Sequence, residues 1–332
     1  MMRRKSMILW YSIILVLLAV TIVVSLTFGA ADISPIAAIR SAINGELESA
    51  EYRILFSVRL PRCFAALLAG SALAVSGVLI QAVLDNPMAA PNIIGVNAGA
   101  GLAVIATVSL FPSMISLIPF SAFFGSLLCC VFIFFIASKT GAGKVTITLV
   151  GIAVTSILNA GISTLKLLFP NTVYNMTTFS VGGLGGVNTR ILIYATPLIL
   201  VCIIVSIAVA RGIDVLSLGE ETAGGLGLNV GALRLILLLC ASALAGAAVS
   251  FAGLLGFIGL VVPHIVRRFT GNKHIRLIPF SALSGALFVL LCDFVCRILF
   301  KPYEIPVGIL LSFIGGVFFV FLILTYRKGR SS

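Results

Sequence analysis

Long stretches without a charged residue constrain the fold of this chain more than any other feature. A helix needs about 20 mainly apolar residues to cross a bilayer. Stretches of this kind occupy residues 6–31, 63–84, 86–138, 145–165, 191–210, 235–266 and 305–326, and a shorter one occupies residues 277–292. Only 10% of the residues are charged, whereas about 25% is usual in water-soluble proteins. The sequence therefore predicts an all-α, polytopic membrane protein.

Two of these stretches are too long for a single crossing. Phe111-Pro112-Ser113 is expected to break the stretch 86–138 into two helices. The stretch 235–266 is either one overlong helix or two helices joined near Gly253 and Gly256. Because cytoplasmic loops are enriched in Lys and Arg, two crossings are favoured. They place Arg267, Arg268, Lys273 and Arg276 on the side of Arg3, Arg4 and Lys5. We therefore expect about ten spans, with both termini in the cytoplasm.

The connections between the spans leave no room for a water-soluble domain, so residues 1–332 are expected to form a single transmembrane domain. The longest cytoplasmic connection, residues 212–233, is amphipathic and glycine-rich, which predicts one or two short helices outside the membrane. The first apolar stretch exceeds the about 7–15 residues of a signal-peptide core, so it is expected to remain as the first span. Basic cytoplasmic loops explain the net charge of +12. The sequence lacks the stripe of basic and aromatic residues that is typical of nucleic-acid binding.

Two segments of the chain resemble each other faintly. Residues 66–79 and residues 242–255 align without gaps, with Gly70 opposite Gly246. The two segments are five spans apart and therefore cross the membrane in opposite directions. This pattern suggests an inverted repeat of helices 2–5 and 7–10, although a shared Ala/Leu/Gly-rich composition also explains the match.

No motif in the sequence indicates an enzyme, a metal site or a cofactor. Gly141-Ala-Gly-Lys144 looks like part of a phosphate-binding loop, but Val145 stands where that loop needs Ser or Thr. The two histidines and seven cysteines show no metal-ligand spacing. We therefore expect that the chain is not an enzyme and that any energy source lies in another subunit.

One buried acid keeps a second mode of transport open. Asp293 is the only carboxylate well inside an expected span, and Arg297 follows at i+4, where it can pair with Asp293 on one helix face. Acids inside a membrane often mark proton or sodium sites. The alternative reading is a proton-coupled secondary transporter that uses Asp293, and a third is a membrane scaffold without a substrate.

Five motifs occur in the order found in one known family. They are Arg59-Leu-Pro-Arg62, the segment Asn86–Pro91 (NPMAAP), the segment Leu218–Gly227, the segment Gly256–Arg268 (GFIGLVVPHIVRR) and Glu304-Ile-Pro-Val-Gly308. Together they resemble the permeases that import iron–siderophore complexes, haem and cobalamin in ATP-driven bacterial transporters. The resemblance implies the type II ABC importer permease fold and a bacterial cytoplasmic (inner) membrane location.

The same resemblance implies the partners of the chain. They are two copies of an ATPase subunit, a second permease that is identical or a paralogue, an extracytoplasmic substrate-binding protein and the membrane lipid. The resemblance implies no cofactor or metal bound by the permease itself. It leaves the substrate open between a siderophore complex, haem and cobalamin.

The resemblance also implies roles for individual residues. Within the connection 212–233, the loop that couples to the ATPase would consist of Leu218, Gly219, Glu220, Thr222, Ala223, Leu226 and Gly227. Arg59, Arg62 and Arg297 would receive acidic residues of the binding protein. Asn86 and Met88 would contribute to the cytoplasmic gate. Ala90 replaces an acidic residue that is usual in the family, so that carboxylate's role is missing here.

Overall fold

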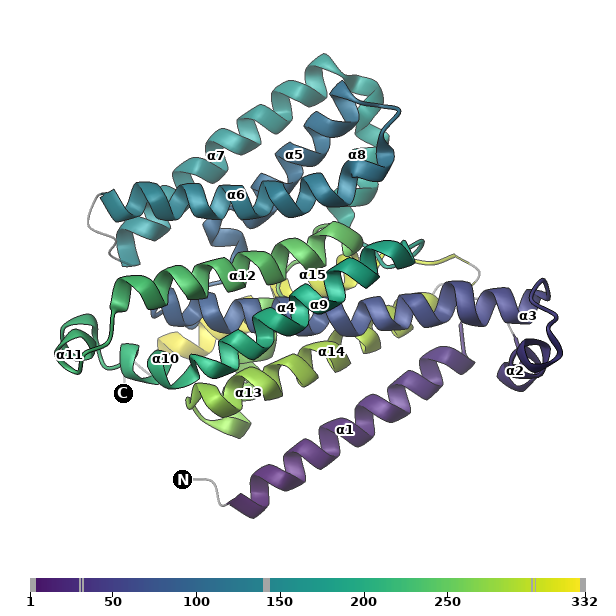
Figure 1. The fold of residues 1–332 in the computed structure, drawn as a ribbon, viewed down its shortest axis with the longest axis horizontal. Coiled ribbons are helices and arrows are strands. Elements are labelled where there is room, and N and C mark those ends of the chain that lie inside the picture. The colour runs from purple at the N-terminus through teal and green to yellow at the C-terminus, as the bar shows by residue number, and fades with distance from the viewer. Residues whose placement is uncertain are drawn as a thin grey trace.

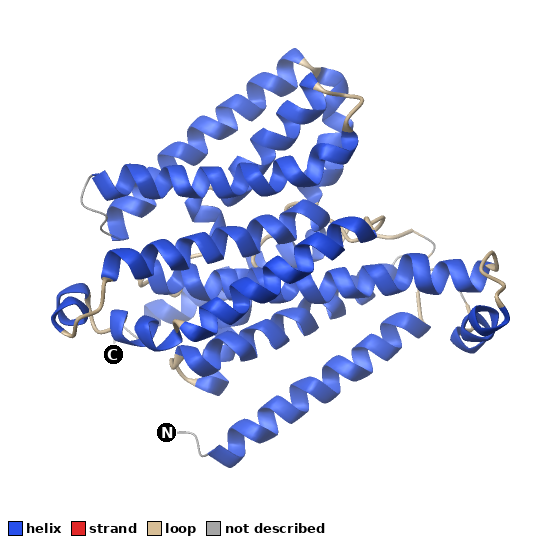
Figure 2. Ribbon diagram, viewed as in Figure 1, coloured by secondary structure: helices blue, strands red, loops and turns tan. Residues whose placement is uncertain are grey.

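The computed structural model describes residues 4–29, 31, 33–139, 144–299, 301 and 303–328, and these form helices and connecting loops without a strand (Figure 2). The phosphate-loop-like residues 141–143 lie outside this part of the chain. The long helices are α1 (Arg4–Thr27), α4 (Leu60–Leu84), α5 (Val96–Leu110), α6 (Ile118–Lys139), α7 (Lys144–Leu168), α9 (Thr189–Ala208), α12 (Val230–Ala252), α13 (Ile258–Thr270), α14 (His274–Leu299) and α15 (Val307–Lys328). The short ones are α2 (Pro35–Asn44), α3 (Ala50–Tyr52), α8 (Val173–Val181), α10 (Ala210–Leu216) and α11 (Glu220–Gly225).

The expected all-α membrane fold is confirmed. In the part of the chain that the structure describes, 7 helices are long and apolar enough to cross a membrane. Two shorter apolar helices, Val96–Leu110 and Val307–Leu322, and the 13-residue α13 stand where the other expected spans lie. The helix count therefore agrees roughly with the expected ten spans.

Both overlong stretches are interrupted where the sequence indicated. α5 ends at Leu110 and α6 begins at Ile118. α12 and α13 are separate helices, and the chain between them turns through positive φ angles at Gly253 (68°) and Phe257 (65°). A positive φ is unfavourable for a bulky residue such as phenylalanine. At Phe257 the ring packs so closely on α15 that a Cβ atom added to Gly315 would lie 2.1 Å from Cγ.

α4 is the central helix of the molecule (Figure 1). In its most apolar part 83% of the residues are buried, because α9, α12, α13 and α14 surround it. Small residues allow these helices to approach closely: a Cβ atom added to Gly70 would lie 2.1 Å from the carbonyl oxygen of Gly285 on α14. One added to Gly77 would lie 2.0 Å from the carbonyl oxygen of Gly259 on α13. Small residues at helix crossings are what membrane packing requires.

The other helices flank this central group. α5, α6, α7 and α8 form a layer on one side, and α1 lies alone on the other (Figure 1). α12 joins the layer to the centre, since Gly246 packs against Ser126 and Phe123 of α6. Gly70 and Gly246, aligned in the suggested repeat, thus both lie at close helix crossings, which is consistent with the repeat.

The long helices give the molecule two ends. α2 and α3 lie at one end, which we call the α3 end, and α11 lies at the opposite end, which we call the α11 end (Figure 1). The start of α1 and the end of α15 both lie toward the α11 end. The long connection 212–233, the start of α1 and the end of α15 are therefore on the same side of the bundle.

Replacing Gly77 by alanine is expected to destabilise the protein. The added Cβ atom would collide with the backbone of Gly259, which cannot rotate away as a side chain can. Overpacking of this kind costs about 1–3 kcal/mol. Thermal unfolding in detergent should detect the loss as a lower Tm. Gly316→Ala on α15, where a Cβ atom would meet nothing within 4 Å, is the control. Equal Tm values for the two variants would contradict the proposed backbone contact.

Candidate functional site

A cluster of charged side chains lies at the α3 end of the bundle. Arg62, in the first turn of α4, donates from Nε to both carboxylate oxygens of Asp293 on α14, at 3.0 and 3.1 Å. Its Nη1 atom lies 2.5 Å from an oxygen of Glu304, in the loop before α15. Arg62 therefore bridges two acids that are carried by different elements.

Arg297 completes the cluster. Its Nε atom lies 3.2 Å from Oδ2 of Asp293, as the i+4 spacing predicted. Its other nitrogens donate to the carbonyl and hydroxyl oxygens of Ser25 on α1. Two arginines thus balance two carboxylates, which suits a place where unpaired charges are costly.

Arg59 holds the end of α1 in a different way. It donates to the carbonyl oxygens of Leu26 and Thr27 at 2.7 Å each, and to that of Ala31. Arg59, Arg62 and Arg297 are only 4%, 7% and 3% exposed. The structure thus places the three arginines expected to dock a binding protein at one end, each engaged in contacts within the chain.

A cavity of about 350 Å³ opens beside Arg62. Its lining includes Glu304, Phe179 and Gly183 as well as the ends of α12 and α6. Of the expected docking residues, Arg62 is the one that lines this cavity. Its ion pair with Glu304, whose side chain is 37% exposed, therefore lies next to open space at the α3 end.

The connection at the α11 end contains two short helices, α10 and α11, as the sequence predicted. Gly219, directly before α11, has a φ of 106°, a value that only glycine adopts readily. Leu218 and Leu226 are 62% and 66% exposed, whereas Ala223 is fully buried. The small helix is thus anchored by one residue and presents two large apolar side chains outside the bundle.

One ion pair and one set of hydrogen bonds fasten this connection to the membrane helices. Both oxygens of Glu220 accept hydrogen bonds from Arg234 of α12, at 3.1 and 2.5 Å. Asp214 of α10 accepts from the backbone N–H of His274 at 2.9 Å and lies 2.7 Å from its ring Nδ1 atom. Sequence reasoning missed both partners, Arg234 and His274. Arg234 could have been predicted to need an acidic partner, because it is the only charged residue in the first turns of an apolar helix.

Asn86 and Met88 lie in the turn that follows α4. Oδ1 of Asn86 accepts the N–H of Met88 at 2.9 Å, and Asp85 adopts a φ of 47°. Pro87 between them lines a cavity of about 660 Å³ together with Arg267 and Arg268 of α13 and Phe318 of α15. The expected gate residues are thus beside a cavity at the α11 end of the bundle.

The chain is similar to known proteins over nearly its whole length. The chain matches the FecCD transport family over residues 17–325. It is 38% identical over 322 residues to the Fe(3+)-citrate import system permease protein YfmE of Bacillus subtilis, covering 97% of this chain and 96% of that protein. It is 37% identical over 326 residues to the hemin transport system permease protein HmuU of Yersinia pestis, covering 96% of each.

The fold has a counterpart among solved structures. A metal-chelate type ABC transporter in an inward-facing conformation superposes with a TM-score of 0.84 and 26% sequence identity, covering 96% of this chain and 99% of that chain. The motifs, the helical architecture and the near-complete coverage of the relatives all lead to one conclusion. This multi-pass membrane protein belongs to the FecCD transport family.

Proposed function

We propose that this chain is the permease subunit of an ATP-driven importer that takes up a ferric chelate or haem. The observation that carries the proposal is the match, over nearly the whole length, to permease proteins named for Fe(3+)-citrate and hemin import. Ferric complexes are the first candidates, and cobalamin is retained as a further one. ATP hydrolysis would occur in two separate ATPase subunits, and a second permease, identical or paralogous, would complete the pathway.

The distribution of basic residues supports one orientation in the membrane. Arg267, Arg268 and Lys273 lie around the turn between α13 and α14, at the α11 end. Because basic residues are enriched on the cytoplasmic side, the α11 end would face the cytoplasm of a bacterium, with both termini there. The α3 end would then face an extracytoplasmic binding protein.

α11 would couple the permease to the ATPase. Its exposed Leu218 and Leu226 offer an apolar surface to a partner, and the Glu220–Arg234 pair offers a path by which movement of α11 reaches α12. Glycines 219 and 227 border this helix with positive φ angles, and Thr222 lies on its exposed side. Asn86 and Met88 would act at the cytoplasmic gate on the same side.

The binding protein would dock through Arg62. An incoming carboxylate could enter the cavity beside Arg62 and compete with Glu304 for its guanidinium, which binds carboxylates in a bidentate way. Arg59 and Arg297 belong to the same proposal. Their docking role would require release of their contacts with the end of α1.

Uptake into proteoliposomes tests the proposed function. The vesicles would contain this chain with the ATPase and binding protein encoded beside it, and labelled ferric siderophores, ferric citrate, haem and cobalamin would be offered with and without internal ATP. We expect ATP-dependent uptake of one ligand. Uptake that follows a proton gradient without ATP would instead favour the secondary transporter that uses Asp293. No uptake under either condition would favour a scaffold.

Glu220→Gln is expected to lower ATP-driven uptake without preventing insertion into the membrane. The substitution removes the charged hydrogen-bond partner of Arg234. A hydrogen bond to a charged group contributes about 1.5–3 kcal/mol to stability, and this one contributes less because Glu220 is partly exposed. Uptake and membrane-fraction yield would be measured together. Glu221→Gln, the same change at the exposed neighbouring position, is the control. Unchanged uptake by the Glu220 variant would contradict the coupling role of this pair.

Glu304→Gln is expected to strengthen docking of the binding protein, because it removes the internal competitor for Arg62. The affinity would be measured by surface-immobilised binding protein at several salt concentrations. Glu48→Gln removes the same charge from the exposed segment before α3 and controls for net charge. If both variants shift the affinity equally, competition at Arg62 is wrong and only overall charge matters.

A further inference from the structure

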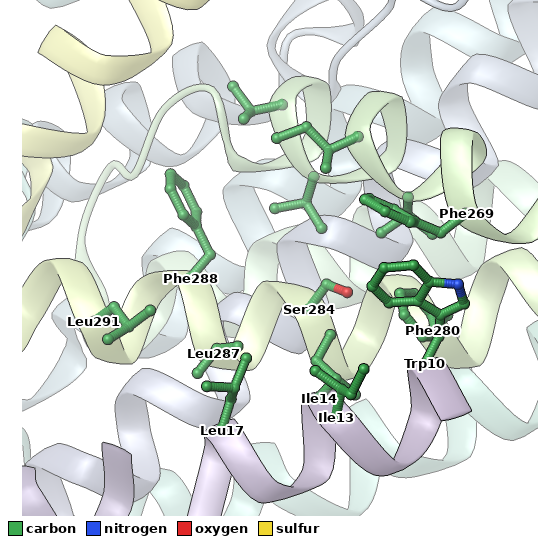
Figure 3. A pocket seen from close by; sticks show the side chains of 14 residues that line it. Trp10, Ile13, Ile14, Leu17, Phe269, Phe280, Ser284, Leu287, Phe288 and Leu291 are labelled. Carbon is green, nitrogen blue, oxygen red and sulfur yellow. The ribbon is translucent and has the colours of Figure 1, made fainter. Parts of the chain in front are cut away.

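An apolar cavity of about 280 Å³ lies where α1 crosses α13 and α14. It shares Ile265 and Phe269 with the cavity beside Pro87, but α1 lines only the apolar one. Figure 3 shows side chains from all three helices around it. Trp10 closes one side, with its ring 4.7 Å from that of Phe269, and Leu287 and Phe288 of α14 lie farther along the cavity. Apart from Ser284, the residues that line it are aliphatic or aromatic.

Hydrocarbon fits this cavity better than water does. Apolar cavities of this size stay dry, because a water molecule needs two to four polar partners. The cavity lies beside α1, in whose most apolar part only 11% of the residues are buried within the chain. α1 is therefore at the periphery of the bundle, where the hydrocarbon available to fill a gap is a lipid acyl chain.

One polar atom in the cavity indicates more than a plain hydrocarbon chain. The Ser284 hydroxyl is buried, and the structure gives it no hydrogen-bond partner. In Figure 3 it lies among the lining side chains, between Leu287 and Trp10. Most buried hydroxyl groups have a partner. Ser109, Thr155 and Ser281 also carry buried hydroxyl groups without one, but of these four residues Ser284 is the one that lines this cavity. An ester carbonyl of a glycerolipid would supply an acceptor for this hydroxyl.

Basic residues stand at one end of the same cavity. Arg276 precedes the lining residue Phe280 by one turn of α14, so the two side chains share a helix face. Arg268 on α13 lines the neighbouring cavity beside Pro87 and is therefore not assigned to this one. Lys273, in the turn between these helices, is exposed. Tyr11 of α1 reaches this end too and donates to the carbonyl oxygen of Arg276 at 3.3 Å.

We propose that this cavity binds an anionic phospholipid. One acyl chain lies among α1, α13 and α14, the Ser284 hydroxyl donates to an ester carbonyl, and Lys273 and Arg276 hold the phosphate. Basic pockets between membrane helices bind anionic head groups in this way. On the proposed orientation the lipid belongs to the cytoplasmic leaflet, and it fastens α1 to the bundle.

The chain carries its own probe for this site, because Trp10 is its only tryptophan. The full-length protein would be reconstituted in unlabelled phosphatidylcholine with a small, equal fraction of lipid brominated on its acyl chains. Bromine quenches tryptophan fluorescence at short range. We expect brominated phosphatidylglycerol to quench Trp10 more strongly than brominated phosphatidylcholine at the same fraction.

Two variants separate the head group from the acyl chain. Lys273→Gln with Arg276→Gln should reduce the preference for phosphatidylglycerol by about fivefold for each basic residue removed. Arg190→Gln, an exposed arginine at the start of α9, should leave the preference unchanged. Ser284→Phe fills the cavity and should reduce quenching by both brominated lipids, whereas Ser156→Phe on the exposed face of α7 should not.

The wild-type comparison alone can overturn the proposal, whether or not the variants fold. Equal quenching by the two brominated lipids would mean that the cavity does not select a charged head group. Weak quenching by both would mean that protein, such as a second copy of the chain, covers the cavity.

Discussion

Close backbone contact around α4 is the condition on which the rest of the structure depends. Lipid is as apolar as the side chains, so burial of apolar surface does not drive membrane helices together. Gly70 against Gly285 and Gly77 against Gly259 allow α4 to lie directly against α14 and α13. The position of α4 in turn places Arg62 at the α3 end and Asn86 at the α11 end. One central helix therefore links both proposed partner surfaces.

The two ends of the bundle use charge differently. At the α3 end, Arg62, Arg297 and Asp293 are nearly inaccessible, and only Glu304 reaches the surface. At the α11 end, Glu220 is partly exposed and joins a small helix to α12. A buried, balanced cluster holds helices in place, since breaking it leaves charges unpaired. The partly exposed Glu220–Arg234 pair can move when a protein bound to α11 moves. This difference supports the proposed coupling role of α11.

Features that depend on neighbouring residues in the chain were predictable. The breaks at residues 111–113 and 253–257, the short helices in 212–233 and the Asp293–Arg297 pair all follow from local composition or i+4 spacing. Arg62 pairs with Asp293 across 231 residues, and no local rule predicts such a pairing. The sequence placed Arg59, Arg62 and Arg297 at one end but left open that all three are buried in internal contacts. The lipid cavity likewise requires three helices whose relative positions no spacing rule supplies.

The sequence by itself determined that this chain is a helical membrane protein, where its two overlong apolar stretches are interrupted, and to which family its motifs point. It did not predict α2, α3 or α8, nor that α4 continues a helical run that begins at Ala50. Helix length, charge placement and turn residues are local properties, so they can be derived without coordinates. Only the tertiary structure decided which helices touch, which acids pair with which arginines and where cavities remain. Phe257 illustrates the reason: its positive φ opposes its local preference, and it is accommodated in the fold by packing on Gly315, 58 residues later in the numbering.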